Sequence, residues 1–247
     1  MNRPLQNKRA LVTGGSRGIG AAIVRRLAND GAHVALTYVS KPDLANETVR
    51  AVRGLGLQGI AIKADNVDAQ AIVNAVERTV GELGGIDILV SSAGIAVMAP
   101  IDEYRLEDFD RMMAVNLRAV FVATQAAVKH MKAGGRIISI GSCNAERMPF
   151  VGGSVYAMSK AALVGLVKGL ARDLGPRGIT VNNVQPGPTD TDMNPADGAF
   201  AGTLKNLMAL PRYGTTDEVA ALVAYLAGPE AGFVTGASLT IDGGFTA

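Results

Sequence analysis

Residues 10–20 of this chain read Ala10-Leu11-Val12-Thr13-Gly14-Gly15-Ser16-Arg17-Gly18-Ile19-Gly20, and an apolar, helix-like segment follows them up to Leu27. The apolar run predicts a buried strand, the glycine-rich run predicts a tight loop, and the next segment predicts a helix. Glycines let the backbone approach a pyrophosphate, and the free N–H groups at the start of a helix attract phosphate. The spacing Gly14-x3-Gly18-x-Gly20 differs from the common GxGxxG, and a glycine-rich turn can be merely structural. Because the loop stands between a strand and a helix, we predict a dinucleotide site here.

Short apolar runs and longer amphipathic segments alternate along the rest of the chain. The runs predicted as strands are 10–13, 33–38, 59–63, 86–91, 136–140, 180–184 and 238–241. Their hydrophobic residues are mostly consecutive rather than alternating with polar ones, which is typical of strands buried on both faces of a parallel sheet. We therefore predict an α/β fold: a single-domain, Rossmann-type doubly wound parallel sheet over residues 1–247, with helices on both faces.

Several candidate residues follow directly after predicted strands. They are Gly14, Tyr38, Asp65, Gly94, Ser142 and Pro186. Ligands of doubly wound sheets bind outside the carboxyl ends of the strands. We therefore expect these residues to converge on one edge of the sheet.

Composition and charge argue against several classes of protein. Hydrophobic residues make up 48% of the 247 residues and charged residues 19%, yet no uninterrupted apolar run reaches the length of a membrane span. Residues 1–9 are polar and basic, so we expect no signal peptide and a cytoplasmic location. The net charge of +2 comes without a basic stripe, which argues against nucleic-acid binding. Two well-separated histidines, His33 and His130, and one cysteine, Cys143, favour neither a metal site nor a disulfide.

Tyr156 and Lys160 stand four residues apart in an apolar helical segment. This spacing places a phenol and an ammonium on one helix face. A fixed cation favours phenolate over phenol, so we expect Lys160 to lower the pKa of Tyr156 toward working pH. Taken alone, such a pair is more often a packed ring beside a partly buried amine. The predicted dinucleotide loop favours a proton-transfer pair instead.

The chain resembles the short-chain dehydrogenase/reductase family over nearly all of its length. The family's motifs are matched by Thr13, Gly14, Gly18 and Gly20 (TGxxxGxG), Asn116 (the helix asparagine), Ser142 (the catalytic serine), Tyr156 and Lys160 (YxxxK), and Pro186 and Gly187 (the PG turn). The resemblance implies hydride transfer between nicotinamide and a ketone, aldehyde or alcohol, with Tyr156 as general acid or base. Ser142 would hydrogen-bond the substrate oxygen and Lys160 would hold the nicotinamide ribose. Asn116 would anchor a water relay behind Lys160.

The sequence departs from the family pattern at two places. Ser142 lies one residue further from Tyr156 than is commonest, and Cys143 stands at the usual distance. The preceding strand still favours Ser142 as the catalytic serine, and Cys143 is either a small buried residue, which we favour, or a reactive thiol. The family often has Asn-Asn where this chain has Ser91-Ser92. We expect the backbone geometry there to survive, and side-chain support of the strand to be in question.

Charge favours NADPH over NADH. An NAD site places a carboxylate on the adenosine ribose, whereas the extra phosphate of NADP needs cations or hydroxyls. The chain offers Ser40 and Lys41 after the second strand, and Arg17 stands within the glycine loop; an exposed, merely solubilising Arg17 is the alternative. The residues expected to bind the cofactor are Gly14, Ser16, Arg17, Gly18, Ile19, Gly20, Tyr38, Ser40, Lys41, Asp65, Asn66, Ala93, Gly94, Tyr156, Lys160, Pro186, Gly187 and Thr189.

Two further regions carry structural expectations. Residues 188–210 have poor strand character and are predicted to form a substrate lid, with a plain surface connection as the alternative. The helical segments at 107–131 and 156–174 carry apolar residues through a wide arc. The family resemblance implies that they form a subunit interface of a homotetramer or dimer, and deep burial within one monomer is the alternative.

Several apolar residues near the predicted site bear on the choice of substrate. Residues that suggest an apolar pocket are Ile95, Ala96, Met98, Met148, Phe150, Val151 and Met193. The chain resembles reductases of 3-oxoacyl carrier substrates, with Arg177 in place of one docking arginine but no clear counterpart of the other. A broad ketone or aldehyde reductase therefore fits better. The alternative is a regulatory protein that binds a cyclic dinucleotide, because residues 141–149 also resemble a family subgroup associated with biofilm dispersal.

Overall fold

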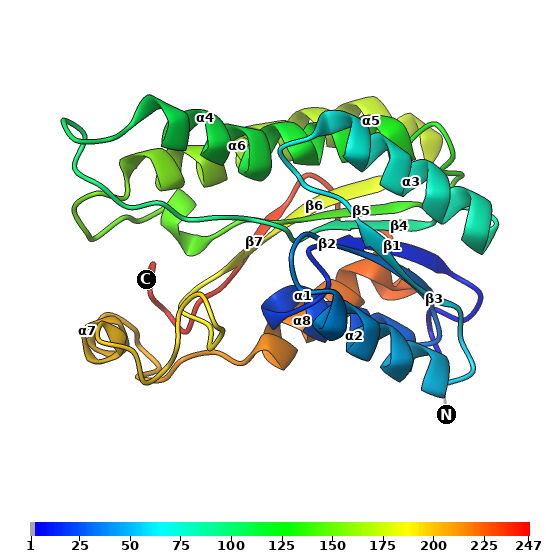
Figure 1. Ribbon diagram of the computed structural model, residues 1–247, viewed down its shortest axis with the longest axis horizontal. Helices are drawn as coiled ribbons and strands as arrows, with labels where there is room; N and C mark the ends of the chain where they lie inside the picture. Colours follow the sequence, from blue (N-terminus) through cyan, green and yellow to red (C-terminus); the bar gives the residue numbers. More distant parts are fainter. Residues whose placement is uncertain (1–2) are drawn as a thin grey trace.

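Seven parallel strands form one sheet in the computed structural model, which describes residues 3–247. The strands lie in the order β3-β2-β1-β4-β5-β6-β7 (Figure 1). Their bounds are β1 (Arg9–Thr13), β2 (His33–Tyr38), β3 (Gly59–Lys63), β4 (Ile88–Ser91), β5 (Arg136–Ile140), β6 (Thr180–Pro186) and β7 (Ser238–Ile241). The predicted doubly wound parallel sheet is confirmed, and each predicted strand is present.

Helices cover both faces of this sheet (Figure 1). Helices α1, α2 and α8 lie on one face and α3, α4, α5 and α6 on the other, while α7 lies apart from both layers. The bounds are α1 (Gly18–Asn29), α2 (Pro42–Gly54), α3 (Ala69–Leu83), α4 (Leu106–Met113), α5 (Ala119–Ala127), α6 (Ser154–Leu174), α7 (Ala201–Asn206) and α8 (Thr216–Ala227). Alternate strand residues serve the two layers: Val12 packs into the core beneath α1 and α8, and Leu11 into the core beneath α3 and α5. Burial on both faces explains why hydrophobic residues follow one another in most of the strands instead of alternating with polar ones.

The strand order reverses between β1 and β4, so the loops that follow these two strands diverge at the carboxyl edge of the sheet. Thr13 and Ser91 are register partners at the ends of β1 and β4. The Thr13 hydroxyl accepts hydrogen bonds from the backbone N–H groups of Ser92 (3.1 Å) and Ala93 (3.3 Å). Thr13 therefore joins the two loops that flank the switch point.

The segment predicted as one helix over residues 107–131 is interrupted. A π-helical turn, Ala114–Arg118, separates α4 from α5, and α5 ends at Ala127. A π turn inserts one residue into the helical ladder and rotates the side chains that follow it. The inserted turn carries Asn116, which is buried.

Helix α6 is apolar beyond what packing on the sheet requires. Within residues 3–247, the helical stretch Ser154–Arg177 is the one that is long and apolar enough by composition to cross a membrane. We did not expect such a helix from the sequence, because no uninterrupted apolar run has this length. Leu163 and Val167 are buried, but only 28% of the most apolar window is covered. Met158 on this helix is exposed. The wide apolar arc predicted from the sequence is therefore only partly buried within one chain.

Candidate active site

The glycine loop after β1 is shaped by close backbone contacts. Gly14 has φ of +66°, and a Cβ atom built on it would lie 2.9 Å from the Ala93 Cα atom. A Cβ atom on Gly20 would lie 2.2 Å from the Gly14 carbonyl oxygen. Both positions exclude a side chain, so the loop can pass directly beneath a ligand. Within residues 3–247, no side chain caps the first turn of α1, which leaves its N–H groups available to an anion.

The residues predicted to hold the adenosine end lie around this loop. Tyr38 is half-buried at the end of β2, and Ser40 and Lys41 after it are exposed. Arg17 is also exposed, and its Nη1 atom lies 3.4 Å from Asp192 Oδ2 on the segment that follows β6. The cations of Arg17 and Lys41 and the hydroxyl of Ser40 suit a phosphate ligand. Asp192 would compete with such a phosphate for Arg17.

The loops after β3 and β6 complete the predicted cofactor set. Asp65 is exposed and Asn66 is buried after β3. Pro186 ends β6, and a Cβ atom on Gly187 would lie 2.5 Å from the Asp242 Cα atom, which explains the glycine of the PG turn. Thr189 is buried in the same loop. The remaining predicted residues, Ser16, Gly18, Ile19, Ala93 and Gly94, line the partly exposed edges of the loops after β1 and β4.

Ser142, Tyr156 and Lys160 come together at the carboxyl edge of the sheet. Lys160 is buried, its Nζ atom donates to the Ile140 carbonyl at 3.0 Å, and it lies 5.9 Å from the centre of the Tyr156 ring. A Cβ atom on Gly94 would lie 3.3 Å from that Nζ atom. Ser142 lies two residues beyond β5, and its side chain is near enough to the Tyr156 phenol to affect the pKa of that phenol. Serine, phenol and amine therefore meet beside the loop that follows β4.

The expected effect of Lys160 on Tyr156 is wrong for this structure. Tyr156 keeps some exposed surface, but burial of its phenol raises its pKa, and the nearby Cys143 adds to the rise while the side chain of Ser142 opposes it. Burial also lowers the pKa of Lys160 to about 8. The low-polarity surroundings disfavour both charged forms. The Lys160 amine is directed at the Ile140 carbonyl and does not reverse the effect of burial on the phenol.

Asn116 links the loop after β4 to helix α6. Its side chain accepts a hydrogen bond from the Ile95 N–H and donates to the Ile95 carbonyl, both at 2.9 Å, and it also donates to Ser159 Oγ at 3.0 Å. Ser159 in turn donates to the Tyr156 carbonyl at 2.7 Å. Asn116 was predicted from the sequence, whereas Ser159 was missed. The available signal was a small polar residue on the buried face of an otherwise apolar helix.

Ser142 and Cys143 occupy different environments. The Ser142 hydroxyl accepts from the Asn144 N–H at 3.1 Å and starts a short 3₁₀ turn, Cys143–Ala145. Cys143 is buried in an apolar cluster that includes Met208 and Phe245, and burial raises the pKa of its thiol to about 12. A thiol with so high a pKa is a poor nucleophile. The inert interpretation of Cys143 therefore agrees with the structure.

The Ser91-Ser92 substitution leaves the backbone intact, as expected. Ser92 N–H still donates to Thr13, as described above. Among residues 3–247, the buried hydroxyl of Ser91 has no hydrogen-bond partner. The backbone bonds thus hold the end of β4 without help from this side chain.

The residues predicted to form a substrate pocket do not share one environment. Phe150 packs against the apolar cluster that contains Cys143, so its side chain belongs to this cluster. Met148 is half-buried beside Asn144, whereas Val151 is 89% exposed. The other members, Ile95, Ala96, Met98 and Met193, range from half-buried to exposed. Arg177 donates to the Val128 and Met131 carbonyls at the end of α5, which accounts for it structurally.

A hollow of about 1080 Å³ lies away from Ser142, Tyr156 and Lys160. It is lined by parts of α4, the π turn, α5 and α6, including Leu117, Phe121 and Leu166. Asp65 at its rim is the only predicted site residue among its lining residues. The hollow therefore belongs to the outer face of these helices.

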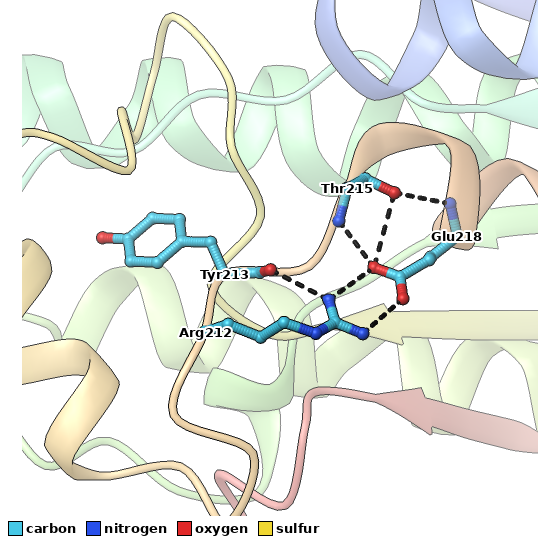
Figure 2. A network of polar contacts seen from close by, with 4 residues as sticks. All are labelled: Arg212, Tyr213, Thr215 and Glu218. Carbon is cyan, nitrogen blue, oxygen red and sulfur yellow. Dashed lines mark hydrogen bonds and ion pairs between the residues drawn. The ribbon is translucent and has the colours of Figure 1, made fainter.

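The segment between α7 and α8 is held by a polar network (Figure 2). Arg212 donates to both carboxylate oxygens of Glu218, at 2.9 and 2.6 Å. Thr215 and Glu218 form a reciprocal capping box at the start of α8. Hydrogen bonds from Arg212 and Thr215 hold the pKa of Glu218 at about 2. This network was missed, although the Thr-x-x-Glu spacing was available in the sequence.

Comparisons with known proteins agree with this geometry. A family model described as "Enoyl-(Acyl carrier protein) reductase" matches residues 14–246. The chain is similar to a solved short-chain dehydrogenase/reductase from Serratia marcescens, with 61% identity and a TM-score of 0.98 over 99% of this chain and 100% of that one. The chain belongs to the short-chain dehydrogenase/reductase family. A structure of a short-chain dehydrogenase from Burkholderia cenocepacia in complex with NADP is 57% identical, with a TM-score of 0.98 over 99% and 100% of the two chains.

A curated relative carries a different description. The "Cyclic-di-GMP-binding biofilm dispersal mediator protein" of Escherichia coli is 49% identical over 240 residues, which is 97% of this chain and 98% of that protein. This short-chain dehydrogenase/reductase is thus similar both to oxidoreductases and to a protein described as binding cyclic di-GMP.

Proposed function

We propose that this short-chain dehydrogenase/reductase is an NADPH-dependent carbonyl reductase, and in reverse an alcohol dehydrogenase, that acts on a ketone or aldehyde. The observation that carries the proposal is the meeting of Ser142, Tyr156 and Lys160 beside a glycine loop at one edge of the sheet. A proton donor thereby lies next to a site suited to a dinucleotide, which is what hydride transfer to a carbonyl requires.

The residues present fit NADPH. Side chains at Gly14 and Gly20 would collide with the backbone of Ala93 and of Gly14, so these glycines keep the tight loop on which a pyrophosphate would lie. Arg17, Ser40 and Lys41 would hold the 2′-phosphate, and the NADP complex of the Burkholderia relative supports this choice. Asp65 and Asn66 would contact adenine, and Thr189 would hydrogen-bond the nicotinamide amide. The bound cofactor would supply the hydride.

The protein's own groups would manage the proton and the orientation. The raised pKa of Tyr156 keeps its phenol protonated, which is the form that a general acid needs when a carbonyl is reduced. Ser142 would donate to the substrate oxygen, where negative charge develops. Lys160 would hold the nicotinamide ribose, and Asn116 would fix the loop that faces it.

The subunit interface is proposed at the helices that remain partly uncovered. Phe121 on α5 and Met158 on α6 are exposed, and the large hollow lies between these helices. Burying such apolar surface favours association into a dimer or tetramer. Light scattering of the purified protein tests this; a monomer at micromolar concentration would reject it.

A regulatory role is the second candidate. The identity of 49% with the cyclic-di-GMP-binding protein of Escherichia coli and the phosphate-binding shape of the glycine loop favour it. In this case a cyclic dinucleotide would bind and compete with NADPH, and carbonyl turnover would be absent. The catalytic residues that meet at the sheet edge favour the enzyme over this candidate.

The test is oxidation of NADPH and NADH with a panel of ketones, aldehydes, diketones and 3-oxo esters. Tyr156→Phe should keep NADPH binding and lower turnover by about 10²–10⁴-fold, because it removes only the proton donor. The matched control is Tyr225→Phe, which removes an exposed phenol on α8. Near-normal turnover of Tyr156→Phe rejects Tyr156 as the acid. Cofactor binding without turnover of any carbonyl, with competition by cyclic di-GMP, places the regulatory candidate first.

A further inference from the structure

The loop that carries Thr189 is fixed by one residue of the segment that leads into α8. Gly214 N–H donates to the Pro188 carbonyl at 2.9 Å, and Asp190 N–H donates to the Gly214 carbonyl at 3.0 Å. Thr189 therefore lies between two backbone hydrogen bonds to the same residue. A Cβ atom on Gly214 would lie 3.7 Å from Glu218 Oε2 and 3.8 Å from Thr189 Oγ1. Gly214 therefore lies between Thr189 and the carboxylate of the Arg212–Glu218 pair.

The backbone on either side of Gly214 is held by that pair (Figure 2). Arg212 Nη1 donates to the Tyr213 carbonyl at 3.1 Å as well as to Glu218. The N–H of Thr215 donates to Glu218 Oε2 at 2.8 Å. Glu218 therefore joins the residues before and after Gly214 to the first turn of α8.

The Tyr213 side chain points away from the ion pair, as Figure 2 shows, and reaches the other side of the lid. Its ring is buried with Met208 and Phe245, and its hydroxyl donates to Asn194 Oδ1 at 3.1 Å. Asn194 N–H donates to the Thr191 carbonyl at 3.0 Å in a tight turn. Tyr213 thus connects the Gly214 anchor to the turn that follows Thr189.

We propose that Tyr213 is a positioning residue for the nicotinamide end of the cofactor. Its hydroxyl holds the turn at Asn194 while Gly214 holds the backbone around Thr189, so that Thr189 is presented to the nicotinamide amide. This inference rests on the proposed function, since it takes NADPH as the ligand. Tyr213 does not touch the cofactor and acts through the lid segment.

Loss of a residue that positions the nicotinamide end should change the Kd values for NADPH and NADH differently from loss of a phosphate contact. NADPH and NADH have the same nicotinamide end, so loss of the Tyr213 hydroxyl should weaken both to the same extent. Arg17 faces the phosphate side, so its loss should affect mainly NADPH. A merely structural tyrosine would lower thermal stability and leave the Kd values of the folded protein unchanged.

The experiment compares Tyr213→Phe with Tyr225→Phe, which removes a hydroxyl from an exposed ring on α8. Dissociation constants for NADPH and NADH are measured from the fluorescence of the reduced nicotinamide, with thermal unfolding measured in parallel. Tyr213→Phe should raise both Kd values by about three- to tenfold, the effect of losing one hydrogen bond. Tyr225→Phe should change neither.

Two further measurements keep the test decisive. NADPH should slow tryptic cleavage after Lys205 in the wild-type protein, and slow it less in Tyr213→Phe, because the lid is then held less firmly. Asn194→Ala removes the same hydrogen bond from the other side and should give the same rise in both Kd values, which covers the case in which Tyr213→Phe does not fold.

Unchanged Kd values in the folded variants, or a loss confined to NADPH, overturn the inference while leaving the proposed function intact. Failure of the wild-type protein to bind either cofactor rejects the proposed function and the inference together.

Discussion

Replacing Asn116 by alanine tests how the loop after β4 is held against the catalytic helix. The Asn116 side chain is 1% exposed and makes three hydrogen bonds: two with the backbone of Ile95 and one with Ser159 Oγ. A buried polar group left without a partner costs about 1–3 kcal/mol. Ile95 is half-buried, so water can reach part of its backbone, and Ser159 keeps the Tyr156 carbonyl as its acceptor. We therefore expect a loss of about 2–4 kcal/mol in the free energy of unfolding.

The assay is urea unfolding of Asn116→Ala and of wild type at equal protein concentration, with Asn74→Ala as the control. Asn74 lies on the exposed face of α3, where a change should shift the free energy by less than about 0.5 kcal/mol. The expected loss corresponds to a fall in Tm of about 4–16 °C for a chain of this size. Because Gly94 in the same loop faces Lys160, carbonyl reduction should fall in the folded variant as well. A loss below about 1 kcal/mol with normal turnover would refute the reasoning, since the three bonds would then contribute little.

Further predictions address charge and reactivity. Arg17→Ala should raise the Kd for NADPH far more than that for NADH, with the exposed Arg25→Ala as control; equal losses contradict the phosphate assignment. Asp192→Asn should tighten NADPH binding by a few fold and leave NADH unchanged, because it removes a competitor for Arg17, whose side chain is 55% exposed; weaker binding would argue against competition. The pKa of Tyr156 is raised above its ordinary value near 10, so its phenol stays protonated through neutral pH. In carbonyl reduction, kcat/KM should therefore show no fall from loss of the Tyr156 proton below about pH 10. Alcohol oxidation needs the phenolate, so its rate should rise with pH. Cys143, with a thiol pKa of about 12, should resist iodoacetamide until the protein unfolds; rapid labelling of the native protein contradicts its burial.

The strands could be predicted from the sequence because their signal is local. Seven short runs rich in hydrophobic residues gave bounds within two residues of those observed. The glycine loop could also be predicted from the sequence. The structure shows why glycine is needed there, since a side chain at Gly14 or Gly20 would collide with the backbone. Parallel strands also place their carboxyl ends at one edge, so residues that directly follow strands, such as Gly14, Gly94 and Ser142, could be brought together without coordinates.

Other features depend on contacts that no local pattern encodes. The π turn at Ala114–Arg118 inserts one residue into an apolar helix. One inserted residue changes the hydrophobic periodicity too little for the turn to be predicted from the sequence. The pKa of Tyr156 follows from the number of groups that displace water around the phenol, which is a property of the packed fold. The hydrogen bond between Tyr213 and Asn194 joins residues 19 positions apart across an irregular loop. Such contacts become visible only when the lid segment is placed against α8.

The uncapped start of α1 connects the cofactor to the lifetime of the protein. Helices α3 and α8 begin with side-chain caps from Asp68 and Thr215, whereas Arg17 supplies none to α1. A cap contributes about 1 kcal/mol, and a bound phosphate would take its place. A ligand at 100 times its Kd stabilises the folded state by about 2.7 kcal/mol. Proteases that degrade transiently opened chains would then remove the empty protein faster than the loaded one, so that the amount of protein in a cell would follow the supply of its nucleotide.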